Sequence, residues 1–209
     1  MKANAYIDGF NFYYGAVRRT PYKWLDFSRL CQLLLRGDTV NRIRYFTAIV
    51  DSRPDDPQKT SRQLTYLRAL ETIPGLSVHL GHFLTQEVTR PLADPPLEGP
   101  QYVRVINTEE KGSDVNLASH LLMDGIAQDY ELAVVFSNDS DLMLPISMVC
   151  NDLGLKVGIF NPHKNVSRAL RAIPNLLFYR PVRSWSLRDS QFPESLTDAN
   201  GTVTKPATW

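Results

Sequence analysis

The chain has 209 residues, of which 43% are hydrophobic, and its 23 basic and 22 acidic side chains give a formal net charge of +1. This length suits one packed domain, and the balanced charge excludes a uniformly basic nucleic-acid binder. Neither cysteine belongs to a zinc or disulfide motif, and no apolar run approaches the length of a membrane span. We therefore expect a soluble, cytoplasmic protein without a membrane partner.

Short apolar or β-branched runs predict strands at 4–7, 42–50, 76–83, 132–136, 155–160 and 175–179. Between them, helical spacing and stop signals predict helices at 26–35, 56–72, 113–126, 142–153 and 165–173. This alternation predicts an α/β fold, a three-layer sandwich with a mainly parallel central sheet, because parallel neighbours need crossover connections. The polar, turn-rich sequence after residue 184 predicts a C-terminal tail, so the domain is expected to span 1–183 and the tail 184–209.

The segment 85–108 interrupts the alternation because it contains four prolines. It is expected to be an excursion of two short strands joined by a proline-rich loop.

Charge is distributed unevenly along the second half of the chain. Residues 107–152 contain nine acidic side chains and a single basic one, Lys111, whereas residues 153–188 contain seven basic side chains and no acid. Two solvated faces would produce this pattern. So would an acidic, cation-attracting centre beside a basic wall that attracts polyanions.

Acidic and amide residues follow the first and fourth predicted strands. Asp8 and Asn11 come after the first, and Ser137, Asn138, Asp139 and Asp141 come after the fourth; Asp114 begins a helix, next to Lys111. Ligands of parallel sheets bind beyond the carboxyl ends of the strands, at the point where strand order reverses. If strands one and four are neighbours there, these groups meet at one edge of the sheet.

Clustered carboxylates repel one another, and a hard divalent cation such as Mg²⁺ offsets that repulsion. Each of these residues can also be a simple turn or helix cap, which is the structural alternative. Position 10 is Phe, so the second acid of a haloacid-dehalogenase site is missing, and the turn lacks the glycine-rich loop of a nucleotide-binding fold.

Three motifs carry a resemblance to a known family: YIDGFNFYYG near the start, EEKGSDVNLASHLL in the middle and VVFSNDSDLMLPI after the fourth strand. In this order, from about Lys2 to about Tyr179, the sequence resembles the NYN domain, of the LabA-like branch of the PIN-like nucleases. The family pattern commonly has Gly where this chain has Asn138, a residue that tolerates left-handed backbone.

The resemblance implies a metal-dependent ribonuclease, with Asp8, Asp114, Asp139 and Asp141 as the catalytic, metal-binding set for Mg²⁺ or Mn²⁺. Asn11, Ser137, Asn138 and Lys111 would support it. Hydrolysis by a metal-activated water would give a 5′-phosphate and a 3′-hydroxyl.

RNA is the expected partner. The candidate contacts are Lys164, Arg168 and Arg171 in the basic segment and Arg104 in the proline-rich excursion. The excursion itself is a candidate flap. A non-catalytic RNA-binding regulator is the alternative function. DNA cleavage is left open, because a metal site alone does not read the 2′-hydroxyl. Homodimer formation is left open as well.

Overall fold

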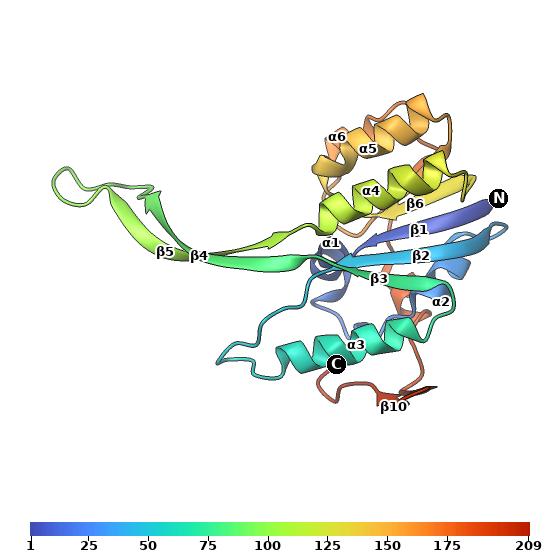
Figure 1. The fold of residues 1–209 in the computed structure, drawn as a ribbon, viewed down its shortest axis with the longest axis horizontal. Helices are drawn as coiled ribbons and strands as arrows, with labels where there is room; N and C mark the ends of the chain where they lie inside the picture. The colour runs from blue at the N-terminus through green and yellow to red at the C-terminus, as the bar shows by residue number, and fades with distance from the viewer.

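The computed structural model describes residues 1–209, and its centre is a six-stranded, wholly parallel sheet (Figure 1). Its strands are β1 (Lys2–Asp8), β2 (Thr39–Thr47), β3 (Leu76–Leu80), β6 (Leu132–Phe136), β7 (Lys156–Asn161) and β8 (Phe178–Pro181). The strand order is β3-β2-β1-β6-β7-β8, so β1 and β6 are neighbours at the point where the order reverses. The predicted α/β class is confirmed.

Helices cover both faces of the sheet (Figure 1). One face carries α2 (Phe27–Leu34) and α3 (Lys59–Glu71), and the other carries α4 (Ser113–Ile126), α5 (Met143–Ser147) and α6 (Arg168–Arg171). Successive side chains of a strand point to opposite faces, so β1 contributes Ala5 and Ile7 to one buried cluster and Tyr6 to the other. The result is the expected three-layer arrangement.

Helical geometry changes along two segments. A short α1 (Gly9–Phe12) and a π-helix (Tyr13–Val17) follow β1 where no helix was predicted. The predicted helix 142–153 begins two residues earlier, with a 3₁₀ turn (Ser140–Leu142), and ends in a second π-helix (Met148–Asp152).

The proline-rich excursion is longer than expected. Strands β4 (His82–Pro91) and β5 (Tyr102–Lys111) pair antiparallel over their whole length and form a ribbon that projects from the body (Figure 1). The predicted strand 76–83 is divided at Gly81, where an added Cβ would lie 2.5 Å from the carbonyl oxygen of Lys111. Most ribbon side chains are exposed, so the ribbon takes little part in the core.

The segment 184–209, expected as a polar tail, is folded onto the face that carries α2 and α3. It contains α7 (Ser184–Arg188), β9 (Ser195–Asp198) and β10 (Gly201–Thr204). Leu187, Phe192 and Val203 are buried in the cluster on that face, and the Trp209 ring lies 5.6 Å from the ring of Tyr66. The few apolar residues of the segment 184–209 therefore form part of this core.

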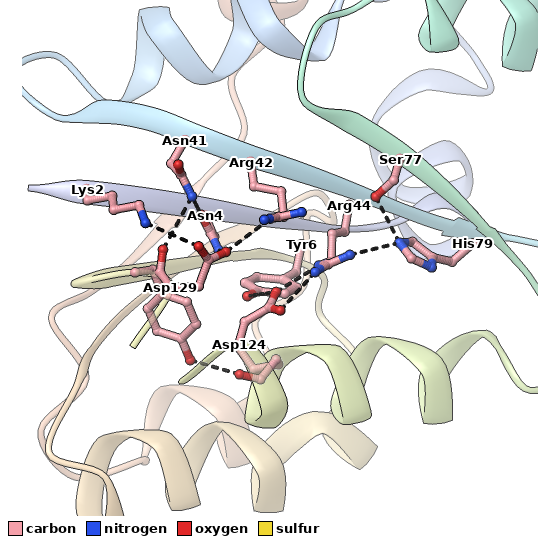
Figure 2. A network of polar contacts seen from close by, with 12 residues as sticks. Lys2, Asn4, Tyr6, Asn41, Arg42, Arg44, Ser77, His79, Asp124 and Asp129 are labelled. Atoms are coloured by element: carbon pink, nitrogen blue, oxygen red, sulfur yellow. Dashed lines mark hydrogen bonds and ion pairs between the residues drawn. The ribbon is translucent and has the colours of Figure 1, made fainter. Parts of the chain in front are cut away.

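A polar network ties α4 to the neighbouring strands (Figure 2). Arg44 of β2 donates two hydrogen bonds, of 2.7 and 2.8 Å, to the Asp124 carboxylate, which also accepts one from the Tyr6 hydroxyl. Asp129 accepts hydrogen bonds from Lys2, Asn4 and Arg42. The Arg44–Asp124 pair is largely buried and fixes the helix whose first turn carries Asp114. No helix of this fold has the length and apolar character needed to cross a membrane.

Candidate metal centre

The sheet brings the two predicted strand ends together. Residues 3–7 of β1 pair with residues 132–136 of β6, so Asp8 and Ser137 leave the sheet side by side at its carboxyl edge. The expectation that strands one and four are neighbours is therefore confirmed.

Three of the four predicted aspartates converge at this edge. Carboxylate oxygens of Asp8, Asp114 and Asp139 lie within 4.8 Å of one another. They come from the end of β1, the first turn of α4 and the loop after β6. Three segments far apart in the chain thus supply one cluster of hard oxygen ligands.

The Asp8 carboxylate is fixed by two hydrogen bonds. One oxygen accepts from the backbone N–H of Asn11 at 3.0 Å, and the other accepts from the Ser137 hydroxyl at 2.8 Å. The Ser137 hydroxyl also accepts from the Asp139 N–H at 3.1 Å, and the Asn11 side chain accepts from the Asn138 N–H at 2.9 Å. These bonds connect the turn after β1 to the loop after β6.

Both acids with raised pKa values lie in this cluster. Burial, assisted by the nearby charges of Asp114 and Asp139, raises the pKa of Asp8 to about 7, although the two hydrogen bonds act to lower it. Partial burial raises the pKa of Asp114 to about 6, with the charges of Asp139, Glu110 and Asp141 acting in the same direction. The cluster is thus electrostatically costly when fully ionised.

Asn138 does not use the left-handed backbone suggested for it, since Gln128 and Asn175 are the non-glycine residues with positive φ. Its side-chain oxygen instead accepts hydrogen bonds from the Tyr179 hydroxyl at 2.6 Å and the Ser167 N–H at 2.9 Å. Asn138 therefore fastens the loop after β6 to the neighbouring loop and to β8.

Two predicted site residues lie outside the triad. Asp141 is exposed, and its backbone N–H donates to the Asp139 carboxylate at 3.0 Å, which caps the 3₁₀ turn. Lys111 is also exposed and forms an ion pair of 2.5 Å with Glu109. Neither residue lines the cleft that contains the triad.

That cleft has a volume of about 590 Å³ and includes residues that the motifs did not single out. Glu110 accepts hydrogen bonds from the N–H and hydroxyl of Ser113 and lines the cleft beside Asp114. His163 and Lys59 line it as well. Of these three residues, only Glu110 lies in one of the quoted motifs, so the sequence could have indicated it. Lys59 and His163 lie in none of the motifs and reach the cleft only through tertiary folding.

The predicted RNA contacts fall in two places. Lys164, Arg168 and Arg171 are exposed in and before α6, and α6 contacts the 3₁₀ turn that includes Asp141. Arg104 lies on the projecting ribbon, where it pairs with Glu87. The structure thus brings the first three near the loop after β6 and places the fourth on a separate element.

The donor set fits a hard divalent cation. It contains carboxylate oxygens without a histidine or cysteine ligand, as Mg²⁺ and Mn²⁺ prefer. The repulsion that raises the pKa values of Asp8 and Asp114 is the kind of cost that a bound cation offsets.

Comparisons with known proteins agree with this architecture. The family model described as NYN domain matches residues 2–179. The chain is 30% identical over 238 residues to 6-hydroxy-3-succinoylpyridine 3-monooxygenase HspA of Pseudomonas putida, an alignment that covers 100% of this chain and 75% of that protein.

A solved structure of a protein of unknown function from Vibrio parahaemolyticus shares the fold. It has a TM-score of 0.53 and 18% identity, with 91% of this chain and 96% of that chain covered. Together with the acidic cluster at the end of β1 and β6, the match over residues 2–179 shows that the chain belongs to the NYN domain family of the PIN-like nuclease superfamily.

Proposed function

We propose that the protein is a metal-dependent endoribonuclease that hydrolyses phosphodiester bonds of RNA. The convergence of Asp8, Asp114 and Asp139 at the carboxyl edge of the sheet carries this proposal. A binding module would gain little from concentrated negative charge in a cleft that receives a polyanion, which argues against the non-catalytic RNA-binding alternative.

The three carboxylates would hold Mg²⁺ or Mn²⁺, which when bound lowers the pKa of a water and stabilises charge on the attacked phosphate. Asp8 is oriented for this by the Asn11 N–H and the Ser137 hydroxyl. The Ser137 hydroxyl accepts from the Asp139 N–H, so one side chain positions two of the acids. Asp141 holds the Asp139 carboxylate through its backbone N–H and faces solvent, where it can join the set when a cation binds.

RNA would reach the cleft along the cations near the loop after β6. Lys164, Arg168 and Arg171 are exposed and form no ion pair with an acid. Binding that depends on such side chains weakens steeply as salt is added, because counterions are released from the phosphates. Arg104 is a weaker candidate, because it is already paired with Glu87.

The proposal is tested by incubating wild-type protein and Asp8→Asn with end-labelled RNA and matched DNA, each with Mg²⁺, Mn²⁺ or EDTA. We expect RNA to be cleaved only by the wild type and only with metal, leaving a 5′-phosphate. A matched control is Asp94→Asn, which removes one carboxylate from the exposed loop of the ribbon and should cleave normally. Undiminished, metal-dependent cleavage by folded Asp8→Asn would refute the assignment.

A second candidate function follows from the Pseudomonas putida relative, which is named as a monooxygenase of 6-hydroxy-3-succinoylpyridine. An aromatic-lined cavity of about 150 Å³ beside the cleft favours it, because this volume suits a single ring.

Such a monooxygenase reaction needs dioxygen and two electrons from a nicotinamide or flavin. The turn after β1, Asp8-Gly9-Phe10-Asn11, is not the glycine-rich loop that holds dinucleotide phosphates, so ribonuclease activity is the first proposal. Oxygen uptake with that pyridine and NADH tests the second.

A further inference from the structure

A second concave site lies next to the acidic cleft. It is a cavity of about 150 Å³ between the helical turn after β1, the end of β2 and α3. Eight of its 18 lining residues are aromatic, among them Phe10, Tyr13, Tyr14, Tyr45, Tyr66 and Trp209. Flat rings on several sides provide stacking surfaces for another flat ring.

The cavity adjoins the cleft. Phe10, Tyr14, Val50 and Lys59 line both of them. Gly9, which follows Asp8 directly, lines the cavity and packs closely on Tyr45, since an added Cβ at Gly9 would lie 2.8 Å from the Tyr45 ring. A ligand that occupies both would place its ring within a few residues of the aspartate cluster.

The polar groups of the cavity suit a ring that has hydrogen-bond acceptors and an attached anion. The Tyr45 ring is buried, yet its hydroxyl makes no hydrogen bond to the protein, so it is free to donate to a ligand. Lys23 and Lys59 also line the cavity, and neither forms an ion pair with an acid. Arg62, at the same wall, is paired with Asp56 at 2.6 Å.

We propose that this cavity binds one pyrimidine base of the RNA strand, next to the phosphate that enters the acidic cleft; this rests on the proposed ribonuclease function. A cavity of about 150 Å³ holds a single six-membered ring such as benzene, which favours pyrimidines over purines. Base stacking on aromatic side chains tolerates any base, so the selection comes from volume. Tyr45 would donate to a base carbonyl, and Lys59, at the shared border, would face the phosphate.

The test measures binding without catalysis. Wild-type protein in EDTA is titrated with UMP, CMP, AMP, GMP and ribose 5-phosphate, and tryptophan fluorescence reports on the cavity through Trp209. UMP and CMP should bind and change the fluorescence, the purine nucleotides should bind at least about 10-fold more weakly, and ribose 5-phosphate should give no response. Equal affinity for purines and pyrimidines, or no binding of either, would overturn the inference.

Variants separate this site from its surroundings. Tyr45→Phe keeps the ring and removes the hydroxyl, so affinity for UMP should fall about 5- to 10-fold, the equivalent of one hydrogen bond. Tyr102→Phe, on the exposed ribbon, removes a hydroxyl elsewhere and should bind UMP as the wild type does. Unchanged UMP affinity in Tyr45→Phe would remove the hydroxyl from the site.

RNA digestion distinguishes the two proposals. Cleavage next to pyrimidines, with pyrimidine binding in EDTA, supports both. Pyrimidine binding without cleavage of any RNA would refute the ribonuclease function and keep the base site. Cleavage without preference for either base class and without nucleotide binding would refute the base site and keep the function.

Discussion

Replacing Asp8 with Asn should make the metal-free protein more stable at neutral pH, although Asp8 is central to the proposed site. Asp8 is only 4% exposed and lies beside Asp114 and Asp139, and burial together with these charges raises the pKa of its carboxyl group to about 7. The folded protein therefore keeps the proton between about pH 4 and pH 7, where the unfolded chain has already lost it. Stability must fall as the pH rises through this window, and Asn removes that loss because it cannot ionise.

The magnitude follows from the two pKa values. Each unit of difference corresponds to about 1.4 kcal/mol, so a pKa raised from 3.8 to about 7 costs about 4 kcal/mol once the pH exceeds 7. Asn still accepts from the Asn11 N–H, but its amide group weakens the hydrogen bond with Ser137 at a cost of about 1 kcal/mol. A net gain of about 3 kcal/mol is the expected order of magnitude.

Urea unfolding in EDTA at about pH 5 and about pH 8 measures this difference. The free energy of unfolding of the wild type should fall by about 3 kcal/mol more than that of Asp8→Asn between the two conditions, because the smaller fall caused by Asp114 is common to both proteins. Asp94→Asn, which removes an exposed carboxylate, should follow the wild type. Parallel pH curves for wild type and Asp8→Asn would refute the reasoning. Mg²⁺ or Mn²⁺ should restore stability to the wild type at the higher pH and leave the variant unchanged.

Three further predictions concern other parts of the molecule. Ser137→Ala removes a hydrogen bond that lowers the pKa of Asp8, so the pH at which Mn²⁺ begins to bind should rise, as calorimetry at several pH values can show. Asp124→Asn leaves Arg44 largely buried without its ion partner and should lower the free energy of unfolding by about 3 kcal/mol. Asp129→Asn, at the more exposed pairs with Lys2 and Arg42, should lower it less, and equal losses in the two variants would contradict this. Replacing residues 85–108 by a short turn should change the free energy of unfolding by no more than about 0.5 kcal/mol, because that ribbon is mostly exposed. A large loss of stability in urea titration would show instead that the ribbon supports the core.

The sheet was predictable because its strands are short, apolar and separated by clear turns. β6 and α4 have the predicted bounds, and β1 and β7 differ only at their ends. The sequence could not show that β4 and β5 continue as a long ribbon, because exposed strands lack the buried alternation that marks a strand. α7 and the β9–β10 hairpin were missed for a related reason: their few apolar residues, such as Leu187 and Val203, become core only by packing on a distant part of the chain.

The site was predictable where residues follow strands directly. Asp8 and Asp139 are reached by reading strand ends, and Asp114 by a motif at the start of a helix. The aromatic cavity was not, because Tyr45, Tyr66 and Trp209 lie on separate elements whose spacing along the chain contains no common signal. Phe10 and Tyr14, which lie in the first of the three motifs, also line that cavity.

The structural and functional interpretations of these aspartates are compatible. Asp8 caps α1 through one oxygen and Asp139 caps the 3₁₀ turn, as a turn or cap sequence predicts. Capping also fixes each carboxylate at the edge where β1 and β6 end, so the local bond that orders the turn orients the acid toward its neighbours. Asp114 has no such bond, since Gly112 begins its helix, and its position depends on the buried Arg44–Asp124 pair that anchors the other end of α4. The triad is thus held by two local caps and one distant ion pair, and disturbing that pair should displace Asp114 before it displaces the two capped acids.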